Sequence, residues 1–344
     1  MRKNSKESFA ENNGILISVL IPVFNSERYI ERCIMSVINQ TFEGDVECVI
    51  CDDCSTDGSM KIVRKLVNGY VGRIHFKIVS HNANKGIAVV RNTLLDAASG
   101  VYLQFVDSDD YMEPQMLEKM YYEAKTKESD IVICDFYHDY GNYKKRDGII
   151  ININCISKED FLKETIKGSL MRTLWCRLIK SSLFEQYHIR AIEGVDYGED
   201  VLFTIPLSYY ANTISCVLVP LYNYSEHTNS ITRSRFSDKK MEDRLLVYKI
   251  VERFLIARGV LTEYSIDFYK ACFKVKETLI KDRKFRNYKM WKRAFPQSNN
   301  YIDQYEMRMA EKIYWKTLLK APSIIRPLWY LVADIVYKRL NSKY

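Results

Sequence analysis

The feature that most constrains the fold is the regular alternation of short apolar runs with amphipathic segments in the first 140 residues. Residues 17–24, ISVLIPVF, are apolar and rich in β-branched side chains, which is typical of a strand buried on both faces. Apolar side chains then recur at helical spacing over residues 30–38, and Asn25 and Ser26 can cap the start of that helix. Such units predict an α/β fold with a mostly parallel sheet between helices.

Similar patterns predict the remaining elements. Strands are expected at 46–51, 74–79, 102–106 and 131–136, helices at 57–67, 87–98, 114–125, 158–166 and 175–184, and a pair of strands near 214–224. Residues 137–156 are mixed and turn-rich. From Asp238 onward the apolar spacing is helical almost to the end, apart from an interruption near 295–300. These patterns together favour two structural parts.

The domain boundaries follow from these patterns. We expect a polar N-terminal tail at 1–14, an α/β domain at 15–237 and a helical, basic region at 238–344. The tail has no apolar run of signal-peptide length, so export is not expected. The composition, 47% hydrophobic and 27% charged, is that of an ordinary folded protein.

The cysteines indicate a reducing compartment. There are nine, an odd number, and several fall in expected core elements, which favours free thiols and a cytoplasmic protein. Cys51 and Cys54 have CxxC spacing, but no second pair and no His partner follows at a zinc spacing.

The C-terminal end is strongly basic. Between Lys281 and Tyr344 there are fifteen Lys and Arg residues against five Asp and Glu. Trp291, Trp315 and Trp329 lie among these cations, a mixture that favours peripheral contact with an anionic membrane over nucleic acid, although a solvated face on packed helices is the alternative. The apolar stretch 324–336 is shorter than the roughly 20 residues that span a bilayer.

Two acidic clusters follow expected strands. Asp52 and Asp53 come directly after residues 46–51 and begin a polar turn. Ser55 or Asp57 in this turn can cap the next helix, or a carboxylate here can accept hydrogen bonds from a pyrimidine base or a ribose. Asp107-Ser108-Asp109-Asp110, which contains a DxD motif, follows residues 102–106. Three carboxylates this close repel one another unless a divalent cation binds them, and a solvated acidic loop is the alternative.

A basic cluster surrounds a third turn. Lys85 and Arg91 flank the expected start of the helix at 87–98. Cations and a helix N-terminus both favour an anion nearby, although an ordinary turn with solvated side chains is as consistent with the pattern.

In their order and spacing these segments resemble one family. ISVLIPVFNSERYI, DDCSTDGS, NKGIAVVRN and FVDSDD look like the donor-binding half of an inverting family 2 glycosyltransferase of the bacterial polysaccharide-assembly type. The resemblance covers residues 17–111, with Cys54 where Gly is usual and Val90 where Ala is common. Downstream, Gly198-Glu199-Asp200 resembles the family's acceptor-side acidic motif. LWCRLIKSSLF and the segment 222–232 are similar to the same type of enzyme.

The resemblance implies a GT-A fold, which is Rossmann-like, and a function. The expected reaction is metal-dependent, inverting transfer of one sugar from a nucleotide-diphosphate sugar, preferably UDP-linked, to a saccharide or lipid-linked saccharide in surface polysaccharide synthesis. Residues 15–140 would bind the nucleotide-sugar and 141–237 the acceptor. The cofactor would be Mn²⁺ or Mg²⁺. Location at the cytoplasmic face of the membrane would suit a lipid-linked acceptor.

The resemblance also assigns roles to single residues. Asp200 would be the catalytic base, Asp109 the principal metal ligand with His227 as a candidate second ligand, and Glu199 and Trp175 acceptor-side residues. The nucleotide-sugar contacts would be Pro22, Phe24, Asn25, Asp52, Asp53, Lys85, Arg91, Asp107 and Ser108.

Two other functional classes remain open. A sugar-nucleotide nucleotidyltransferase uses a related sheet with phosphate-binding glycines after the first strand, but residues 22–26 contain none. A non-enzymatic descendant of the fold, acting as a nucleotide-binding or scaffold protein, is consistent with the pattern too. A processive synthase is less expected, since the chain has no Gln-x-x-Arg-Trp motif.

Overall fold

The computed structural model describes residues 14–148, 157–170, 172–227, 237–281 and 287–320. Expectations for the N-terminal tail, for the end of the segment 222–232 and for Trp329 therefore lie wholly or largely outside the described residues. The chain divides into two compact units between Phe254 and Leu255.

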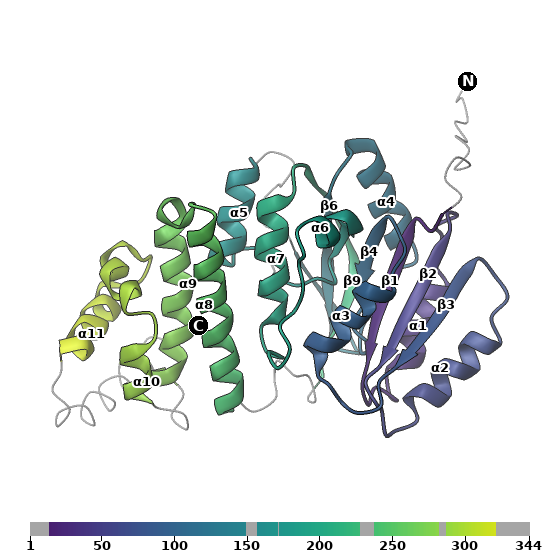
Figure 1. Ribbon diagram of the computed structural model, residues 1–344, viewed down its shortest axis with the longest axis horizontal. Coiled ribbons are helices and arrows are strands. Elements are labelled where there is room, and N and C mark those ends of the chain that lie inside the picture. The colour runs from purple at the N-terminus through teal and green to yellow at the C-terminus, as the bar shows by residue number, and fades with distance from the viewer. Residues whose placement is uncertain (1–13, 149–156, 171, 228–236, 282–286, 321–344) are drawn as a thin grey trace. The chain divides into compact units, whose positions relative to one another are not determined.

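The first unit contains a nine-stranded sheet in the order β3-β2-β1-β4-β8-β6-β9-β5, with β7 paired to β6 (Figure 1). Its first four strands are parallel, as expected: β1 (Ile17–Val23), β2 (Val46–Asp52), β3 (Ile74–Ser80) and β4 (Tyr102–Phe105). Every residue of β1 and β2 is buried, which explains their continuous apolar character. Because these strands are parallel, the turns after β1, β2 and β4 meet at one edge.

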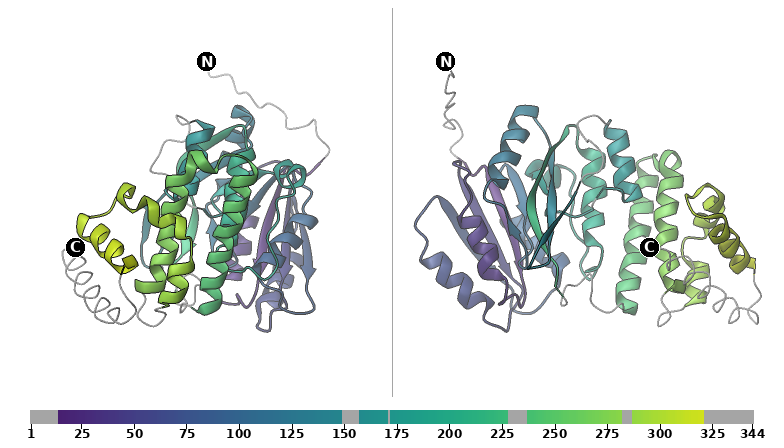
Figure 2. Two further views of the ribbon diagram at one scale, coloured as in Figure 1. Left: turned by 60° about the vertical axis from the view of Figure 1, so that its left-hand side comes forward. Right: turned by 180° about the vertical axis from the view of Figure 1, so that it is seen from behind.

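Helices cover both faces of this parallel part. They are α1 (Ile30–Ile38), α2 (Ser59–Asn68), α3 (Ile87–Ala97) and α4 (Met116–Lys127). α3 lies in front of the strands in Figure 1, and α1 comes forward when the molecule is seen from behind in Figure 2. This arrangement confirms the expected sheet between two helical layers.

The other half of the sheet is mixed. β6 (Ile131–Asp139) forms a hairpin with β7 (Lys144–Asp147), runs antiparallel to β8 (Arg177–Lys180) and is parallel to β9 (Ile214–Ser225). The short β5 (Tyr111–Met112) pairs antiparallel with β9. The helices of this half are α5 (Lys158–Lys167), α6 (Ser181–Gln186) and α7 (Glu199–Tyr210).

Two expectations for this half are wrong. Residues 175–184 do not form one helix, because β8 inserts between β4 and β6 before the short α6 begins. The expected pair of strands near 214–224 is the single strand β9, whose pairing with β6 shifts register at Asp135. In both segments the sheet decides the conformation, since local spacing alone cannot distinguish a buried strand from a short helix.

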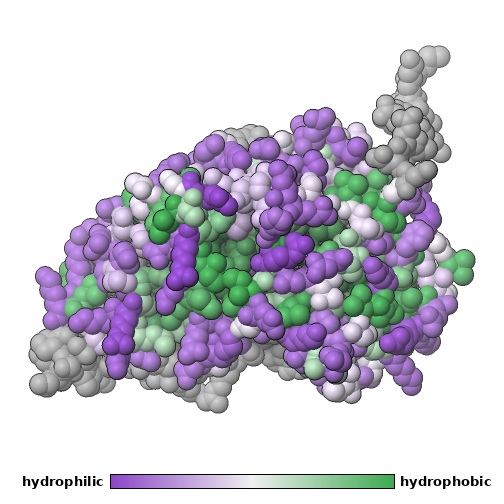
Figure 3. Space-filling view, viewed as in Figure 1, coloured by the Kyte–Doolittle hydropathy of each residue, from purple (hydrophilic) through white to green (hydrophobic). Residues whose placement is uncertain are grey.

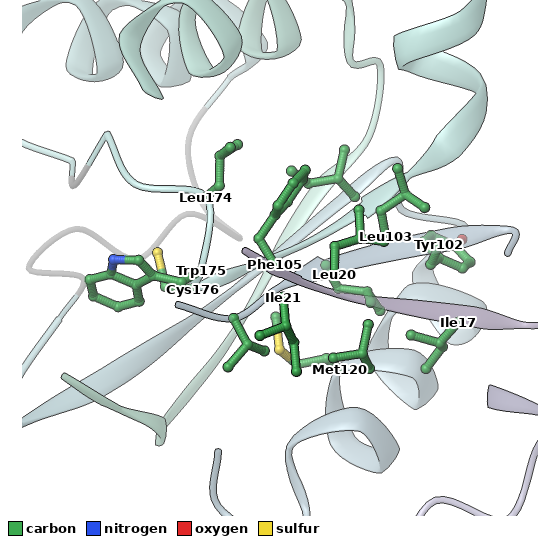
Figure 4. Packing of buried hydrophobic residues seen from close by; sticks show 14 of the residues in the cluster. Ile17, Leu20, Ile21, Tyr102, Leu103, Phe105, Met120, Leu174, Trp175 and Cys176 are labelled. Atoms are coloured by element: carbon green, nitrogen blue, oxygen red, sulfur yellow. The ribbon is translucent and has the colours of Figure 1, made fainter. Parts of the chain in front are cut away.

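Buried side chains from both halves of the sheet form one core. Leu20, Phe105 and Trp175 belong to it, and Figure 4 shows them among neighbours that come from β1, β4 and the chain before β8. The core is therefore continuous beneath the edge where the turns after β1, β2 and β4 meet.

The rest of the chain is helical where described, as expected. Its elements are α8 (Asp238–Ala257), α9 (Leu261–Lys281), α10 (Tyr288–Arg293), the 3₁₀ helix η2 (Pro296–Gln304) and α11 (Met309–Lys320). η2 accounts for the interruption near 295–300, where Pro296 stands at its start. None of the helices among the described residues is both long and apolar enough to cross a membrane.

Two of the tryptophans in the basic region are core residues. Trp291 is 0% exposed and Trp315 is 1% exposed, and their rings stack on each other inside the second unit. They therefore cannot contact a membrane surface, contrary to the interpretation of these two aromatics as surface residues.

On the face of the molecule shown in Figure 3, hydrophobic side chains lie among hydrophilic ones.

Candidate active site

The turns after β1, β2 and β4 are held together by hydrogen bonds. Asn25 Oδ1 accepts the amide of Thr56 at 2.8 Å, which joins the first turn to the second. The Ser26 and Ser108 hydroxyls are 2.6 Å apart, which joins the first turn to the acidic turn after β4. Pro22 is within β1, and Phe24 is 47% exposed beside these turns. Four of the expected nucleotide-sugar residues therefore lie at the same edge.

Two residues in these turns have left-handed backbone angles. Asn25 has φ of 50° and Cys54 has φ of 63°. Asn tolerates this conformation well, whereas a side chain such as that of Cys pays a steric cost there. The geometry explains why glycine suits position 54. Neither Cys51 nor Cys54 is in a disulfide, and the eight cysteines in the described part of the chain are all free.

Asp53 is engaged by the loop before α3. Its Oδ1 accepts the amide of Lys85 and its Oδ2 the amide of Gly86, each at 2.9 Å, and His81 Nδ1 lies 2.7 Å from Oδ1. The neighbouring Asp52 accepts the amide of Ser55 at 2.9 Å. Both carboxylates therefore support the turns, and a contact of either with a base or a ribose stays a prediction.

A second carboxylate approaches the same helix start from the other half of the unit. Asp196 Oδ1 accepts the amide of Ala88 at 3.2 Å. A Cβ at Gly86 would lie 2.5 Å from the Asp196 carboxylate, and the φ of Gly86 is +86°, so glycine is required there. The anion favoured at the start of α3 is thus supplied by the protein itself, through Asp53 and Asp196. The sequence gives no signal for Asp196.

Arg91 lies at the centre of a buried cluster of carboxylates. It is 3% exposed and projects from α3. Its Nε is 3.3 Å from Glu199 Oε1, and its Nη2 is 3.5 Å from Asp107 Oδ1 and 3.3 Å from Asp200 Oδ1. Its Nη1 is buried without a hydrogen-bond partner among the described residues. The cluster joins the turn after β4 to the first turn of α7, two segments about ninety residues apart in sequence.

The cluster changes the acidity of its members. Burial raises the pKa of Asp200 to about 8, the charges of Glu199 and Asp107 add to the shift, and Arg91 opposes it. Burial also raises the pKa of Asp107 to about 6. A carboxyl group with a pKa near neutrality, in reach of a substrate, is suited to proton transfer.

The carboxylates in the acidic turn after β4 have different surroundings. Asp110 is 1% exposed, accepts the amide of Ser225 at 2.7 Å and the hydroxyl of Tyr222 at 2.9 Å, and so anchors the turn to β9. The Tyr222 hydroxyl also accepts the amide of Asp107 at 3.1 Å. Burial raises the pKa of Asp110 well above its ordinary value. The sequence could not separate this structural carboxylate from its neighbours.

Asp109 and His227 face each other at the end of the turn. Asp109 Oδ2 lies 2.8 Å from His227 Nε2, and the side chains are 34% and 15% exposed. His227 stacks on Tyr29, with ring centroids 4.6 Å apart, and its Nδ1 is buried without a hydrogen-bond partner in the described chain. Residues 14–148, 157–170, 172–227, 237–281 and 287–320 contain no group of three His, Cys, Asp or Glu side chains that could hold a metal ion. The Asp109 carboxylate fits Mn²⁺ or Mg²⁺ if donor phosphates supply further oxygen ligands, whereas the His227 imidazole suits a transition metal such as Mn²⁺ and not Mg²⁺.

Trp175 belongs to the core. It is 3% exposed, and its ring stacks on Tyr222 with centroids 4.5 Å apart and meets Phe136 edge-on. This burial favours the interpretation of Trp175 as a packing residue. A contact between its ring and an acceptor sugar stays a prediction.

Comparisons with known proteins show the family to which the chain is similar. Residues 18–187 match the family model described as glycosyl transferase family 2. The chain is 32% identical over 256 residues to the putative glycosyltransferase EpsH of Bacillus subtilis, covering 72% of this chain and 71% of that protein. It is 31% identical over 192 residues to the poly(ribitol-phosphate) beta-N-acetylglucosaminyltransferase TarP of Staphylococcus aureus, covering 55% of this chain and 56% of TarP.

A solved structure shares the fold. The crystal structure of residues 1–349 of TarS from Staphylococcus aureus, in complex with UDP-GlcNAc, superimposes with a TM-score of 0.64 at 21% identity. The likeness covers 93% of this chain and 88% of that one. At this level of identity the likeness concerns the fold, which is therefore of the GT-A type with a helical C-terminal region.

Proposed function

The chain belongs to glycosyltransferase family 2, and on that premise we propose that it is a metal-dependent, inverting enzyme that transfers one sugar from a UDP-sugar. The acceptor is a saccharide or a lipid-linked saccharide of a surface polysaccharide. UDP is favoured by the resemblance of the donor-side motifs, and TarS, whose structure has the same fold, binds UDP-GlcNAc.

The observation that carries this proposal is the cluster around Arg91. One buried guanidinium lies within 3.5 Å of carboxylates from both sides of the site, Asp107 after β4 and Asp200 on α7. Asp107 belongs to the turn that also carries Asp109. The turn with the candidate metal ligand and the helix with the candidate base, Asp200, therefore meet at Arg91. A glycosyltransferase needs this arrangement, because the acceptor hydroxyl and the leaving diphosphate must flank one sugar carbon.

The proposed mechanism is a single displacement. Asp200 removes the proton of the acceptor hydroxyl while that oxygen attacks the anomeric carbon, and the bond to the nucleoside diphosphate breaks on the opposite side. The anomeric configuration therefore inverts, and no covalent intermediate on the enzyme is required. Arg91 orients Asp200 and balances the negative charge of the carboxylates around it.

Asp109 and His227 are the residues that would hold the metal ion. When bound, a divalent cation neutralises the charge that develops on the leaving diphosphate. Asp110 does not compete for this role, because both of its oxygens are already bound to β9.

A thermal-shift experiment tests the donor site. Addition of UDP and Mn²⁺ at about 100 times the dissociation constant should stabilise the protein by about 2.7 kcal/mol. Asp109→Ala should abolish the manganese-dependent part of the shift, whereas Asp96→Ala, which alters a carboxylate paired with Arg190, should keep it. The absence of a shift with any nucleotide in the unaltered protein would count against the proposed function.

The pH dependence of transfer follows from the raised pKa of Asp200. A general base must be ionised, so kcat/KM should rise about tenfold per pH unit below pH 8 and level off above it. Initial rates between pH 6 and 9.5, with UDP binding measured in parallel, provide the test. A rate that stays constant from pH 6 to 8 would show that Asp200 is not the base.

Contact with the cytoplasmic face of a membrane is part of the proposal, because a lipid-linked acceptor resides there. The end of the basic region, residues 321–344, lies outside the described residues, and its sequence supports this contact by its cations and apolar stretch. Removal of these residues should reduce sedimentation with anionic liposomes. Unchanged sedimentation would refute the membrane contact and leave the transfer reaction unaffected.

A further inference from the structure

Two tyrosine rings stack on each other at the tip of the β6–β7 hairpin. The ring centroids of Tyr140 and Tyr143 are 4.6 Å apart with an interplanar angle of 14°. The Tyr140 amide donates to the Tyr143 carbonyl at 3.0 Å, and Gly141 takes the positive φ of 85° that the turn needs. Tyr140 is 38% exposed and Tyr143 is 56% exposed. A rigid turn therefore holds a pair of aromatic rings in solvent.

This pair is the outer end of a row of aromatic rings that begins at the candidate active site. Each ring is within 6.3 Å of the next, centroid to centroid. From the inside outward the rings are those of Tyr222, Trp175, Tyr224, His138, Tyr140 and Tyr143. Tyr222, which is 0% exposed, bonds both Asp107 and Asp110. The row thus connects the acidic turn with the surface of the hairpin.

Hydrogen bonds fix the hairpin beside the candidate metal site. The Glu226 amide donates to the Asp139 carbonyl at 2.8 Å, and Glu226 directly precedes His227 in the chain. Arg32 Nη1 bonds the Asp139 carboxylate at 3.3 Å, and its Nη2 bonds the backbone carbonyl of Asp109 at 3.4 Å. The hairpin and the turn that carries Asp109 are therefore held by shared partners.

We propose that Tyr140 and Tyr143 bind the acceptor saccharide, by stacking on the face of a sugar unit one or more positions away from the hydroxyl that is glycosylated. This inference rests on the proposed function. The C–H face of a sugar ring packs on an aromatic ring, and its hydroxyls remain at the edge for polar neighbours, among which the exposed Lys145 lies across the hairpin from His138. Two rings form too small an apolar patch for a stable protein interface.

The site explains how the enzyme selects its acceptor. Arg91 contacts carboxylates of the protein, and Asp200 is proposed to act on one acceptor hydroxyl. A pair of rings on the hairpin contacts a second sugar unit and so distinguishes a chain from a single sugar. Loss of the Tyr143 ring should therefore raise the KM for an oligosaccharide acceptor by about tenfold, the effect of one aromatic contact, and leave kcat unchanged. A purely structural role in the turn would instead lower the melting temperature without selectively changing KM.

The experiment compares variants on an array of immobilised oligosaccharides of two to six hexose and N-acetylhexosamine units, with UDP and Mn²⁺ present. Tyr143→Ala should bind the recognised glycan about tenfold more weakly, and Tyr143→Trp, which keeps an aromatic face, should bind within about twofold of the unaltered protein. Tyr122→Ala, which removes a 69% exposed ring on α4, is the matched control and should bind normally. If Tyr143→Ala melts early, Tyr143→Leu keeps apolar bulk without a ring and should show the same loss.

The outcomes separate this inference from the proposed function. Equal glycan binding by Tyr143→Ala and the unaltered protein would overturn the inference, and so would failure of the unaltered protein to bind any glycan on the array. Ring-dependent glycan binding without a UDP-dependent thermal shift would uphold the saccharide site and overturn the transferase proposal. A normal UDP-dependent thermal shift together with glycan binding that does not depend on the ring would support the transferase proposal and overturn the saccharide site.

Discussion

Asp200→Asn will reduce sugar transfer by about 10³-fold, the contribution that a positioned general base makes to such a reaction. The amide has nearly the shape of the carboxylate, but it cannot take the proton of the acceptor hydroxyl. Binding of UDP should persist, because the hydrogen bonds that join the turns after β1, β2 and β4 to one another do not involve Asp200. Transfer rates and UDP-dependent thermal shifts, measured on the same preparation, provide the test.

Glu199→Gln is the matched control for this substitution. Glu199 precedes Asp200 on α7 and contacts the same guanidinium, with Arg91 Nε 3.3 Å from its Oε1. If the loss of activity came from disturbing Arg91, both variants would lose activity equally. Near-normal transfer by a correctly folded Asp200→Asn would exclude Asp200 as the base.

Arg91→Met will destabilise the first unit by about 3–5 kcal/mol, because it leaves buried carboxylates without their cation. Asp107, Glu199 and Asp200 would each lose a partner within 3.5 Å. Urea unfolding near pH 7.5 measures this loss. The matched control is Arg190→Met, since Arg190 pairs at 3.3 Å with an Asp96 side chain that is 67% exposed, and it should cost no more than about 1 kcal/mol.

The same variant has a kinetic signature that a packing defect would not produce. Arg91 lowers the pKa of Asp200, so its removal should raise that pKa further. The alkaline rise in kcat/KM should therefore move to higher pH in any residual activity of Arg91→Met. An unchanged midpoint would show that Arg91 contributes to stability without positioning or tuning Asp200.

The parallel half of the fold was predictable because its signals are local. β1 and β2 are continuous apolar runs, and the turns after them carry polar clusters that parallel pairing must bring to one edge. The mixed half was not predictable to the same degree. β8 has four residues and β5 has two, and strands this short exist only because neighbouring strands complete their hydrogen bonds.

The residues of the candidate site were likewise predictable only where their signals are local. The sequence placed Asp109, Asp200 and Arg91 in acidic and basic motifs, but their separation along the chain concealed that Arg91 faces the carboxylate of α7. Asp196 was missed because it is a single acidic residue in an irregular segment before α7. Asp110 was included in a cluster of three carboxylates, and only burial against β9 distinguishes it from Asp109.

The start of α3 has a consequence for how this enzyme can be re-engineered. The amides of Lys85 and Gly86, just before the helix, are bound by Asp53 from the proposed donor half, and the amide of Ala88 in its first turn is bound by Asp196 from the proposed acceptor half. Grafting the proposed acceptor half, residues 141–237, from a relative would therefore remove the carboxylate that binds the Ala88 amide of α3, unless the graft brings an acidic residue to the same place. We expect chimeras across this boundary to fold only when they keep both carboxylates and a glycine at position 86. Donor and acceptor specificity are therefore not exchangeable independently of each other.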